Sequence, residues 1–158
     1  MVCSKILAIA FCAIAAFSTV LRVEAGCSEE HVQVLGFSSE NVTEDSLKRG
    51  REVAGLLRKL MLGNLTKTGA KDTTPLTNKF TKTLTKAGYP EIPAECLSCF
   101  VQSAQCVMKE CKGACIAGDQ SPGCVKCFMA HCADDLHACV GHITINIGEH
   151  KNAGKGGK

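Results

Sequence analysis

The sequence predicts a small all-α, disulfide-rich protein in which two short amphipathic helices precede a C-terminal antiparallel helical hairpin stapled by several disulfides. Three observations predict this fold class. Nine of the twelve cysteines lie within residues 96–139, apolar residues recur at helical spacing in two segments upstream, and the chain opens with a segment typical of secretory signal peptides.

The first residues decide how the cysteines are interpreted. Lys5 precedes an apolar run from Ile6 to Phe17, and Val23 and Ala25 stand three residues and one residue before a plausible cleavage point. We therefore expect residues 1–25 to be a signal peptide. The alternative is an uncleaved anchor, but the run is shorter than the roughly 20 apolar residues of a spanning helix. A secreted or lumenal chain would form disulfides.

Cleavage there would leave a cysteine count that suits a closed framework. It would remove Cys3 and Cys12, so that twelve minus two, or ten, cysteines remain, and an even number can pair completely. Aromatic residues make up only 4% of the chain and tryptophan is absent. Because little large apolar side chain is available for burial, we expect cross-links to carry part of the stability.

The charge is modest overall but unevenly distributed. The mature chain would carry sixteen basic and fourteen acidic residues, which does not suggest a nucleic-acid-binding protein. Residues 48–86, however, hold ten basic residues against Glu52 and Asp72. The basic residues are Lys48, Arg49, Arg51, Arg58, Lys59, Lys67, Lys71, Lys79, Lys82 and Lys86. This basic segment is either the solvated faces of two helices or a surface attracted to an anionic membrane.

The first amphipathic helix is predicted at about residues 45–62. Thr43 is a capping residue followed by acidic residues, and Gly63 suits the C-terminal end. The apolar positions recur at helical spacing, at Leu47, Val53, Ala54, Leu57, Leu60 and Met61.

The second amphipathic helix is predicted at about residues 75–87. Thr74 is the expected cap, Pro75 suits the first helical position, and Gly88 ends the segment. Its apolar stripe consists of Leu76, Phe80, Leu84 and Ala87. In both helices such a stripe is more simply interpreted as a face buried in the core than as a ligand-binding site.

A cysteine-rich hairpin is predicted at residues 94–141, after an N-terminal region at 26–93. Few helix breakers interrupt its two arms, and the stretch IAGDQSPG between Cys115 and Cys124 is rich in turn-forming residues. Counted outward from the turn, cysteine spacings are 4, 5 and 7 on one arm and 3, 5 and 7 on the other. One antiparallel register therefore opposes four pairs, namely Cys99 with Cys139, Cys106 with Cys132, Cys111 with Cys127, and Cys115 with Cys124.

Helical geometry supports the outer two pairs more strongly than the inner two. At about 100° per residue, cysteines seven residues apart lie within about 20° of each other on one helix face. The step from Cys106 to Cys111 turns the side chain by about 140°, which two straight helices cannot accommodate. Either the arms bend or loosen near residues 107–110 and 128–131, or the inner cysteines pair differently. Cys96 would remain for Cys27.

The cysteines and histidines permit two other interpretations. Cys96, Cys99, Cys124 and Cys127 have the spacing of a four-thiolate zinc site, but an oxidising compartment disfavours it, so we expect no metal or other cofactor. The stretch CFMAHCADD resembles the active-site helix of secreted phospholipases, which implies a hydrolase centred on His131. That family has its cysteine three residues before the histidine, whereas here the separation is four, and no glycine-rich calcium loop lies upstream.

Two sequons and a tail complete the expectations. Asn41 and Asn64 begin Asn-X-Thr sequons and are candidate glycosylation sites, and the glycine- and lysine-rich segment 142–158 is predicted to be a disordered tail.

We assign no catalytic residue. The sequence favours a secreted, non-catalytic protein that presents a rigid helical surface to an unknown protein or glycan partner. A protein that binds membrane surfaces through residues 48–86 and a small hydrolase are the alternatives.

Overall fold

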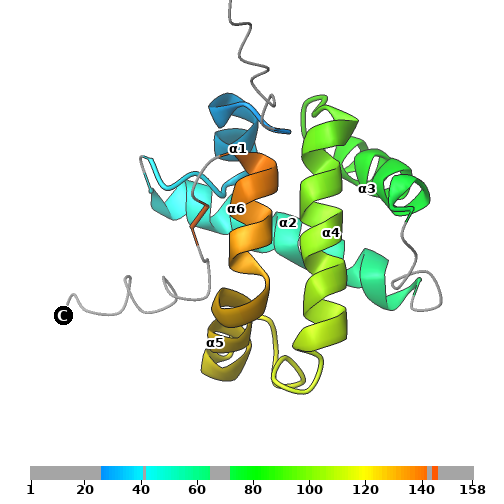
Figure 1. Ribbon diagram of the computed structural model, residues 1–158. Helices are drawn as coiled ribbons and strands as arrows, with labels where there is room; N and C mark the ends of the chain where they lie inside the picture. Colours follow the sequence, from blue (N-terminus) through cyan, green and yellow to red (C-terminus); the bar gives the residue numbers. More distant parts are fainter. Residues whose placement is uncertain (1–25, 41, 65–71, 142–143, 146–158) are drawn as a thin grey trace, which may run out of the picture.

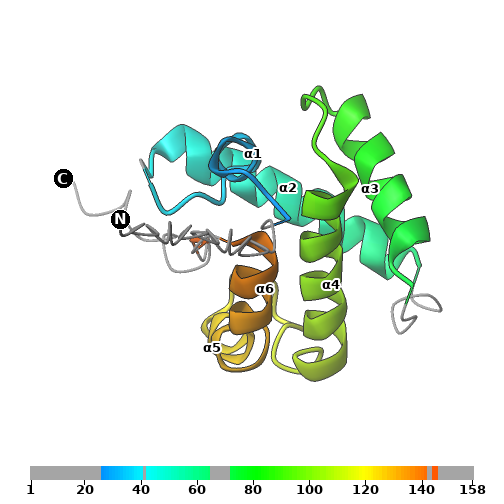
Figure 2. The same cartoon turned by 45° about the horizontal axis from the view of Figure 1, so that its top comes forward.

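The computed structural model describes residues 26–40, 42–64, 72–141 and 144–145. These residues form an all-α fold (Figure 1). Its helices are α1 (Glu29–Leu35), α2 (Glu44–Leu62), α3 (Thr74–Lys86), α4 (Ala94–Glu110), α5 (Pro122–His131) and α6 (Ala133–Val140). α4 lies between α3 on one side and α6 on the other (Figure 2). The predicted fold class, a small disulfide-rich helical protein, is confirmed.

The two predicted amphipathic helices are α2 and α3, each within one residue of its expected bounds. At the start of α2, the Thr43 side chain accepts a hydrogen bond from the Ser46 amide, and the Ser46 hydroxyl oxygen accepts one from the Thr43 amide. The N-cap of α3 is Thr73 rather than Thr74, and Pro75 occupies its first turn as expected. The cap signal at Thr43 therefore predicted the start of α2 correctly, whereas the predicted cap Thr74 is the first residue of α3, and Thr73 makes no side-chain capping bond.

An additional short helix, α1, precedes them and was not expected from the sequence. Ser28 caps it in a reciprocal arrangement with His31, and Gly36 ends it in the left-handed conformation at φ 80°. A Cβ atom on Gly36 would overlap the backbone of Ser46 and Gly50 in α2. Glycine at this position therefore allows α1 to end directly against α2.

The hairpin consists of α4 as one arm and of α5 and α6 as the other. The bending or loosening that was one alternative for the second arm near residues 128–131 occurs as a break at Cys132, where φ −128° and ψ −16° depart from helical values. α6 runs beside α4, and α5 turns away from that direction (Figure 1). The break therefore divides the second arm into a segment packed on the core and a segment at the end of the hairpin.

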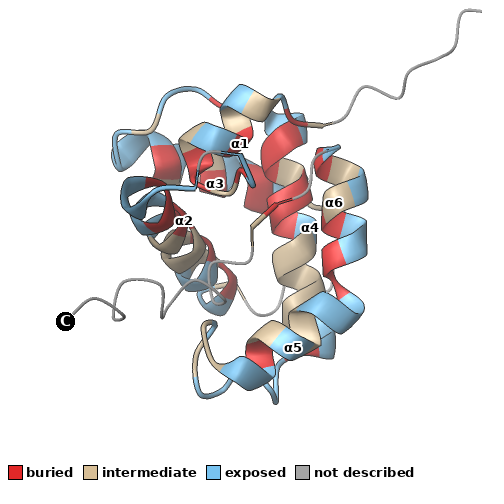
Figure 3. Ribbon diagram, turned by 90° about the vertical axis from the view of Figure 1, so that its left-hand side faces the viewer, coloured by how far each residue is buried: buried red, intermediate tan, exposed pale blue. Residues whose placement is uncertain are grey.

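The core lies where α1, α2, α3, the first half of α4 and α6 meet (Figure 3). Val32, Val53, Phe80 and Val101 are fully buried there. Burial then stops abruptly along the hairpin. In residues 102–132, which we call the stapled tip, every buried residue is a cysteine: Cys111, Cys124 and Cys132.

Several predicted features lie partly or wholly outside the described residues. These are the signal peptide at 1–25, the sequon residue Asn41, and Lys67 and Lys71 of the basic segment. The predicted tail at 142–158 also lies outside them, apart from Thr144 and Ile145, which form hydrogen-bonded contacts with the rest of the fold. Thr144 is buried and forms an isolated β-bridge with Ser38, and the Ile145 amide donates a hydrogen bond to the Phe37 carbonyl (2.9 Å).

Candidate binding groove beside the stapled tip

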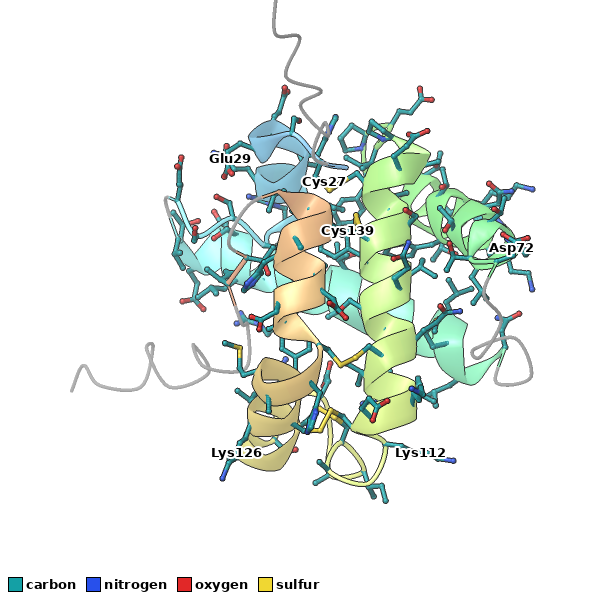
Figure 4. All side chains as sticks on the ribbon, viewed as in Figure 1. Cys27, Glu29, Asp72, Lys112, Lys126 and Cys139 are labelled. Carbon is teal, nitrogen blue, oxygen red and sulfur yellow. A yellow bond between two sulfur atoms is a disulfide. The ribbon has the colours of Figure 1, made fainter. Side chains whose placement is uncertain are left out.

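Five disulfides connect the described cysteines (Figure 4). They are Cys27–Cys96, Cys99–Cys139, Cys106–Cys132, Cys111–Cys127 and Cys115–Cys124, with Cα–Cα separations between 4.4 and 5.9 Å. These separations are ordinary for disulfides. The four hairpin bonds join the pairs that share the antiparallel register, including the two inner pairs for which the straight-helix geometry left alternatives open.

The inner bonds form because neither arm is a straight helix near them. α4 ends at Glu110, so Cys111 lies just beyond it with φ −114° and ψ 7°. On the second arm the helix breaks at Cys132, five residues after Cys127. These two departures absorb the 140° rotation between Cys106 and Cys111. The end of α4 and the break in the second arm therefore lie at or within one residue of the ranges where the arms were predicted to bend or loosen.

A groove opens between α2 and the stapled tip, with a volume of about 370 Å³. Its walls come from the C-terminal half of α2, the outer half of α4, the turn after α4, α5 and one residue of α6. A neighbouring recess of about 160 Å³ shares Phe37, Ala54, Val107 and Phe128 with the groove and extends to Ile145. The volume of the groove is within the range of roughly 300–1,000 Å³ that is usual for small-molecule sites.

The groove is apolar inside because of the residue types that face it. Fourteen of its eighteen lining residues are apolar, and the hydroxyl of Ser103 is the neutral polar exception. Two of the wall positions are alanines, Ala54 on α2 and Ala104 on α4, which leave space between these helices. Because three disulfides secure the tip, its arms stay together although few side chains are buried between them.

The mouth of the groove combines exposed apolar side chains with charges. Ile116 is 79% exposed and Leu62 is 49% exposed, and both line the same groove, so they extend its apolar surface to the solvent. The charged lining residues are Arg58, Lys112 and Asp119, and all three are exposed. Arg58 on α2 forms an ion pair with Asp119 in the turn (3.9 Å). The charged groups of the groove therefore lie at its solvent-exposed edge.

Lys112 has no ion-pair partner in the part of the chain that the structure describes. The nearest carboxylate in sequence, Glu110, is paired with Lys109 at 2.7 Å. The Lys109 ammonium donates a hydrogen bond to that carboxylate and holds the pKa of Glu110 below its ordinary value. Glu110 therefore satisfies Lys109 and leaves the charge of Lys112 uncompensated by a direct contact.

The histidine site suggested by the sequence does not come together. His131 is exposed at the end of α5, and Asp135, the acidic residue four positions later that could orient its imidazole in an unbroken helix, is exposed on α6 beyond the break at Cys132. Among the described residues, no hydrogen bond or ion pair joins the two side chains. Within the same residues, no group of three or more potential metal ligands gathers, and the cysteines of the zinc interpretation are all in disulfides.

The apolar faces of the helices in the basic segment are not exposed for contact with a membrane. The apolar stripes of α2 and α3 are buried in the core, including Leu57, Phe80 and Leu84. The lysines of the segment that the structure describes are exposed, with Lys79, Lys82 and Lys86 on α3. No helix within the described residues is long and apolar enough to cross a membrane.

The sequon residue Asn64 lies just after α2. Its side-chain amide nitrogen donates a hydrogen bond to the Leu60 carbonyl (2.7 Å), and its side-chain oxygen accepts one from Lys79 (2.6 Å). The amide nitrogen to which a glycan would be attached is therefore engaged with the end of α2 in this structure. Leu65 and Thr66 of the sequon lie outside the described residues.

The groove was missed by sequence reasoning, although one signal pointed to it. Ile116 is a large apolar residue in an otherwise polar turn, where burial in a core is not expected. Comparison with known proteins adds no further guide: no protein-family model, curated protein or solved structure gives a significant match to the chain.

Proposed function

We propose that this is a secreted, non-catalytic binding protein whose rigid helical surface is the groove between α2 and the stapled tip. The observation that carries the proposal is an open, mostly apolar groove of about 370 Å³ beside residues that three disulfides secure. Such a groove leaves apolar side chains in contact with water, which is unfavourable unless a partner covers them. Five disulfides are compatible with a secretory compartment.

Rigidity supports binding rather than catalysis. Disulfides join the two arms of the tip and fix that wall before a partner arrives, and the α2 wall is held by its packing on the core, so little conformational entropy is lost on binding. The groove lining contains no histidine or cysteine thiol, and its single carboxylate, Asp119, is paired with Arg58. The proposal therefore assigns the partner to the groove and no chemical step to its residues.

A neutral apolar dye, N-phenylnaphthylamine, tests the proposal. The oxidised mature protein should bind it saturably at one site. The variant Ala104→Leu, which narrows the groove from α4, should weaken that binding. The matched variant Ala130→Leu adds the same side chain at an exposed position on α5 that does not line the groove, and it should bind normally. Equal loss in both variants, or no saturable binding, would reject the groove as the binding site.

A second candidate is attachment to an anionic membrane surface through the basic segment. The exposed lysines of α3 favour it, because Lys79, Lys82 and Lys86 recur at three- and four-residue intervals and so share one side of that helix. Sedimentation with anionic vesicles should then be strong at low salt and weaken as salt screens the charges over about 10 Å at 0.1 M. Lys82→Glu should reduce sedimentation more than Lys126→Glu on α5. Equal binding to neutral vesicles would exclude this mechanism.

A further inference from the structure

We propose that the groove binds a free fatty-acid carboxylate, with the alkyl chain inside the groove and the carboxylate at the mouth beside Lys112 and Arg58. This inference rests on the proposed function, because it names the class of ligand for the same groove. It is carried by the distribution of charge within the lining. The interior presents apolar atoms, whereas the charged lining residues are exposed at the edge.

The shape of the site favours a small ligand over a protein surface. Stable protein interfaces bury about 800 Å² on each partner and need a broad contact area. Here the apolar surface is instead concave, and the recess beyond Phe128 lengthens it towards Ile145. An elongated apolar chain can follow such a path, and each methylene that it buries there favours binding.

The charges at the mouth favour an anionic head group. Two cations and one anion line the groove, so its edge is net positive by one charge. Lys112 has no ion-pair partner within the described residues, and Glu110 is engaged with Lys109. A carboxylate at the mouth would gain a partner in Lys112 while remaining partly hydrated. A neutral head group would gain no such contact, and a cationic one would be repelled.

The Arg58–Asp119 pair adds a second contribution. It connects α2 to the turn of the hairpin across the groove lining, and both side chains are nearly half exposed. A ligand carboxylate would compete with Asp119 for the Arg58 guanidinium. Asp119 therefore opposes anion binding in two ways, by direct repulsion and by occupying Arg58.

The experiment compares three amphiphiles that share one alkyl chain: decanoate, decanol and decyltrimethylammonium. Each is titrated against N-phenylnaphthylamine bound to the oxidised mature protein at neutral pH, with the two ionic amphiphiles kept below their micelle-forming concentrations and decanol below its solubility limit. We expect decanoate to bind most tightly and decyltrimethylammonium most weakly. Added salt should weaken the binding of decanoate but not that of decanol, since only the binding of decanoate involves an ionic contact.

Variants identify the residues involved. Lys112→Glu should lower the affinity for decanoate about three- to fivefold or more and leave the affinity for decanol unchanged, as expected for loss of an exposed ion pair. Lys112→Met removes the charge and keeps an unbranched side chain that is one atom shorter, and it serves if Lys112→Glu misfolds. Lys126→Glu, the matched control outside the groove, should leave decanoate unchanged. Asp119→Asn should tighten decanoate binding.

The outcomes separate this inference from the proposed function. If all three amphiphiles bind equally and Lys112→Glu matches Lys126→Glu, the groove is an apolar site without anion recognition, and only the fatty-acid assignment is overturned. If the dye binds saturably but no amphiphile displaces it, the fatty-acid assignment is again overturned. If decanoate binds equally well to Ala104→Leu, it binds elsewhere and the inference fails. If the dye itself does not bind, the proposed function fails as well.

Discussion

The two ends of the hairpin are held together by different means. Near α1, α2 and α3, buried apolar side chains of α4 and α6 join a continuous core. In the stapled tip the only buried residues are cysteines, and three disulfides cross between the arms. The contrast shows how an apolar hollow can persist. Where packing holds a structure together, hydrophobic collapse would close such a space, whereas covalent bonds hold the tip without filling it.

The largest expected difference comes from truncating one phenylalanine in each region. Phe80→Ala removes a fully buried ring from the core and should lower the free energy of unfolding by about 3–5 kcal/mol. Phe128→Ala removes a partly exposed ring from the groove wall and should cost less than about 2 kcal/mol. Urea unfolding of the oxidised proteins measures both. Equal losses would mean that the tip is packed as tightly as the core.

Removing one disulfide tests how far the stability of the stapled tip depends on its covalent bonds. The double variant Cys106→Ala and Cys132→Ala should lower the free energy of unfolding by about 2–3 kcal/mol, because the bond restricts the unfolded chain. Helical content should remain largely intact, since Cys99–Cys139 and Cys111–Cys127 still hold the arms on either side. Thermal unfolding followed by far-ultraviolet circular dichroism reports both quantities. An unchanged midpoint would show that the staple is redundant.

A smaller effect distinguishes the helix caps of the two regions. Thr43→Ala removes the side-chain acceptor for the Ser46 amide and should cost about 1 kcal/mol. Ser121→Ala removes the equivalent acceptor for the Cys124 amide at the start of α5. That residue is already fixed by the Cys115–Cys124 bond, so we expect a cost below about 0.5 kcal/mol. Comparable costs, measured by the same urea titration, would contradict the view that cross-links dominate the tip.

The smallest effect concerns alkaline pH and the core region. Burial, assisted by the negative charge of Glu52, raises the pKa of Tyr89 above its ordinary value. The folded state therefore favours the neutral phenol. This contribution is complete below the unfolded pKa of about 10 and is lost as pH rises through the higher folded value. Tyr89→Phe should reduce the alkaline loss of stability.

Tyr89 is the only tyrosine and tryptophan is absent, so the ultraviolet absorbance of the phenolate follows this one group. Titration of the folded protein should give a midpoint above that of the unfolded chain. A midpoint equal to the unfolded value would contradict the burial of the Tyr89 hydroxyl. The stapled tip contains no tyrosine, so this titration reports only on the surroundings of Tyr89 in the core region.

The features predicted correctly from sequence depend on local chemistry or on simple periodicity. The ends of α2 and α3 follow from capping residues, proline and glycine, and their buried faces from apolar spacing. The antiparallel register follows from cysteine spacing, because facing residues in a hairpin have a constant sum of residue numbers. Each of these signals lies within one segment or between two segments that are joined by a short turn.

The missed features depend on contacts between distant segments. α1 has only seven residues, and its place depends on the close approach of Gly36 to α2, which no local pattern reports. The sequence predicts the break at Cys132 only as one of two alternatives, because no helix-breaking residue marks it. The groove requires Ala54 and Ala104, fifty residues apart in sequence, to face the same space. Small residues in a helix are too common to predict such a hollow.

The two disulfides nearest the ends of the described chain determine how the protein would bear mechanical load. Cys27 is bonded to Cys96, and Cys99, three residues further along α4, is bonded to Cys139. A pulling force applied at Gly26 and Gly141 would pass through these two bonds and the short backbone between Cys96 and Cys99. α2, α3 and the stapled tip lie outside that path. The residues of α2, α4 and α5 that line the groove lie outside this path and would therefore carry almost no tension while Gly26 and Gly141 were pulled apart.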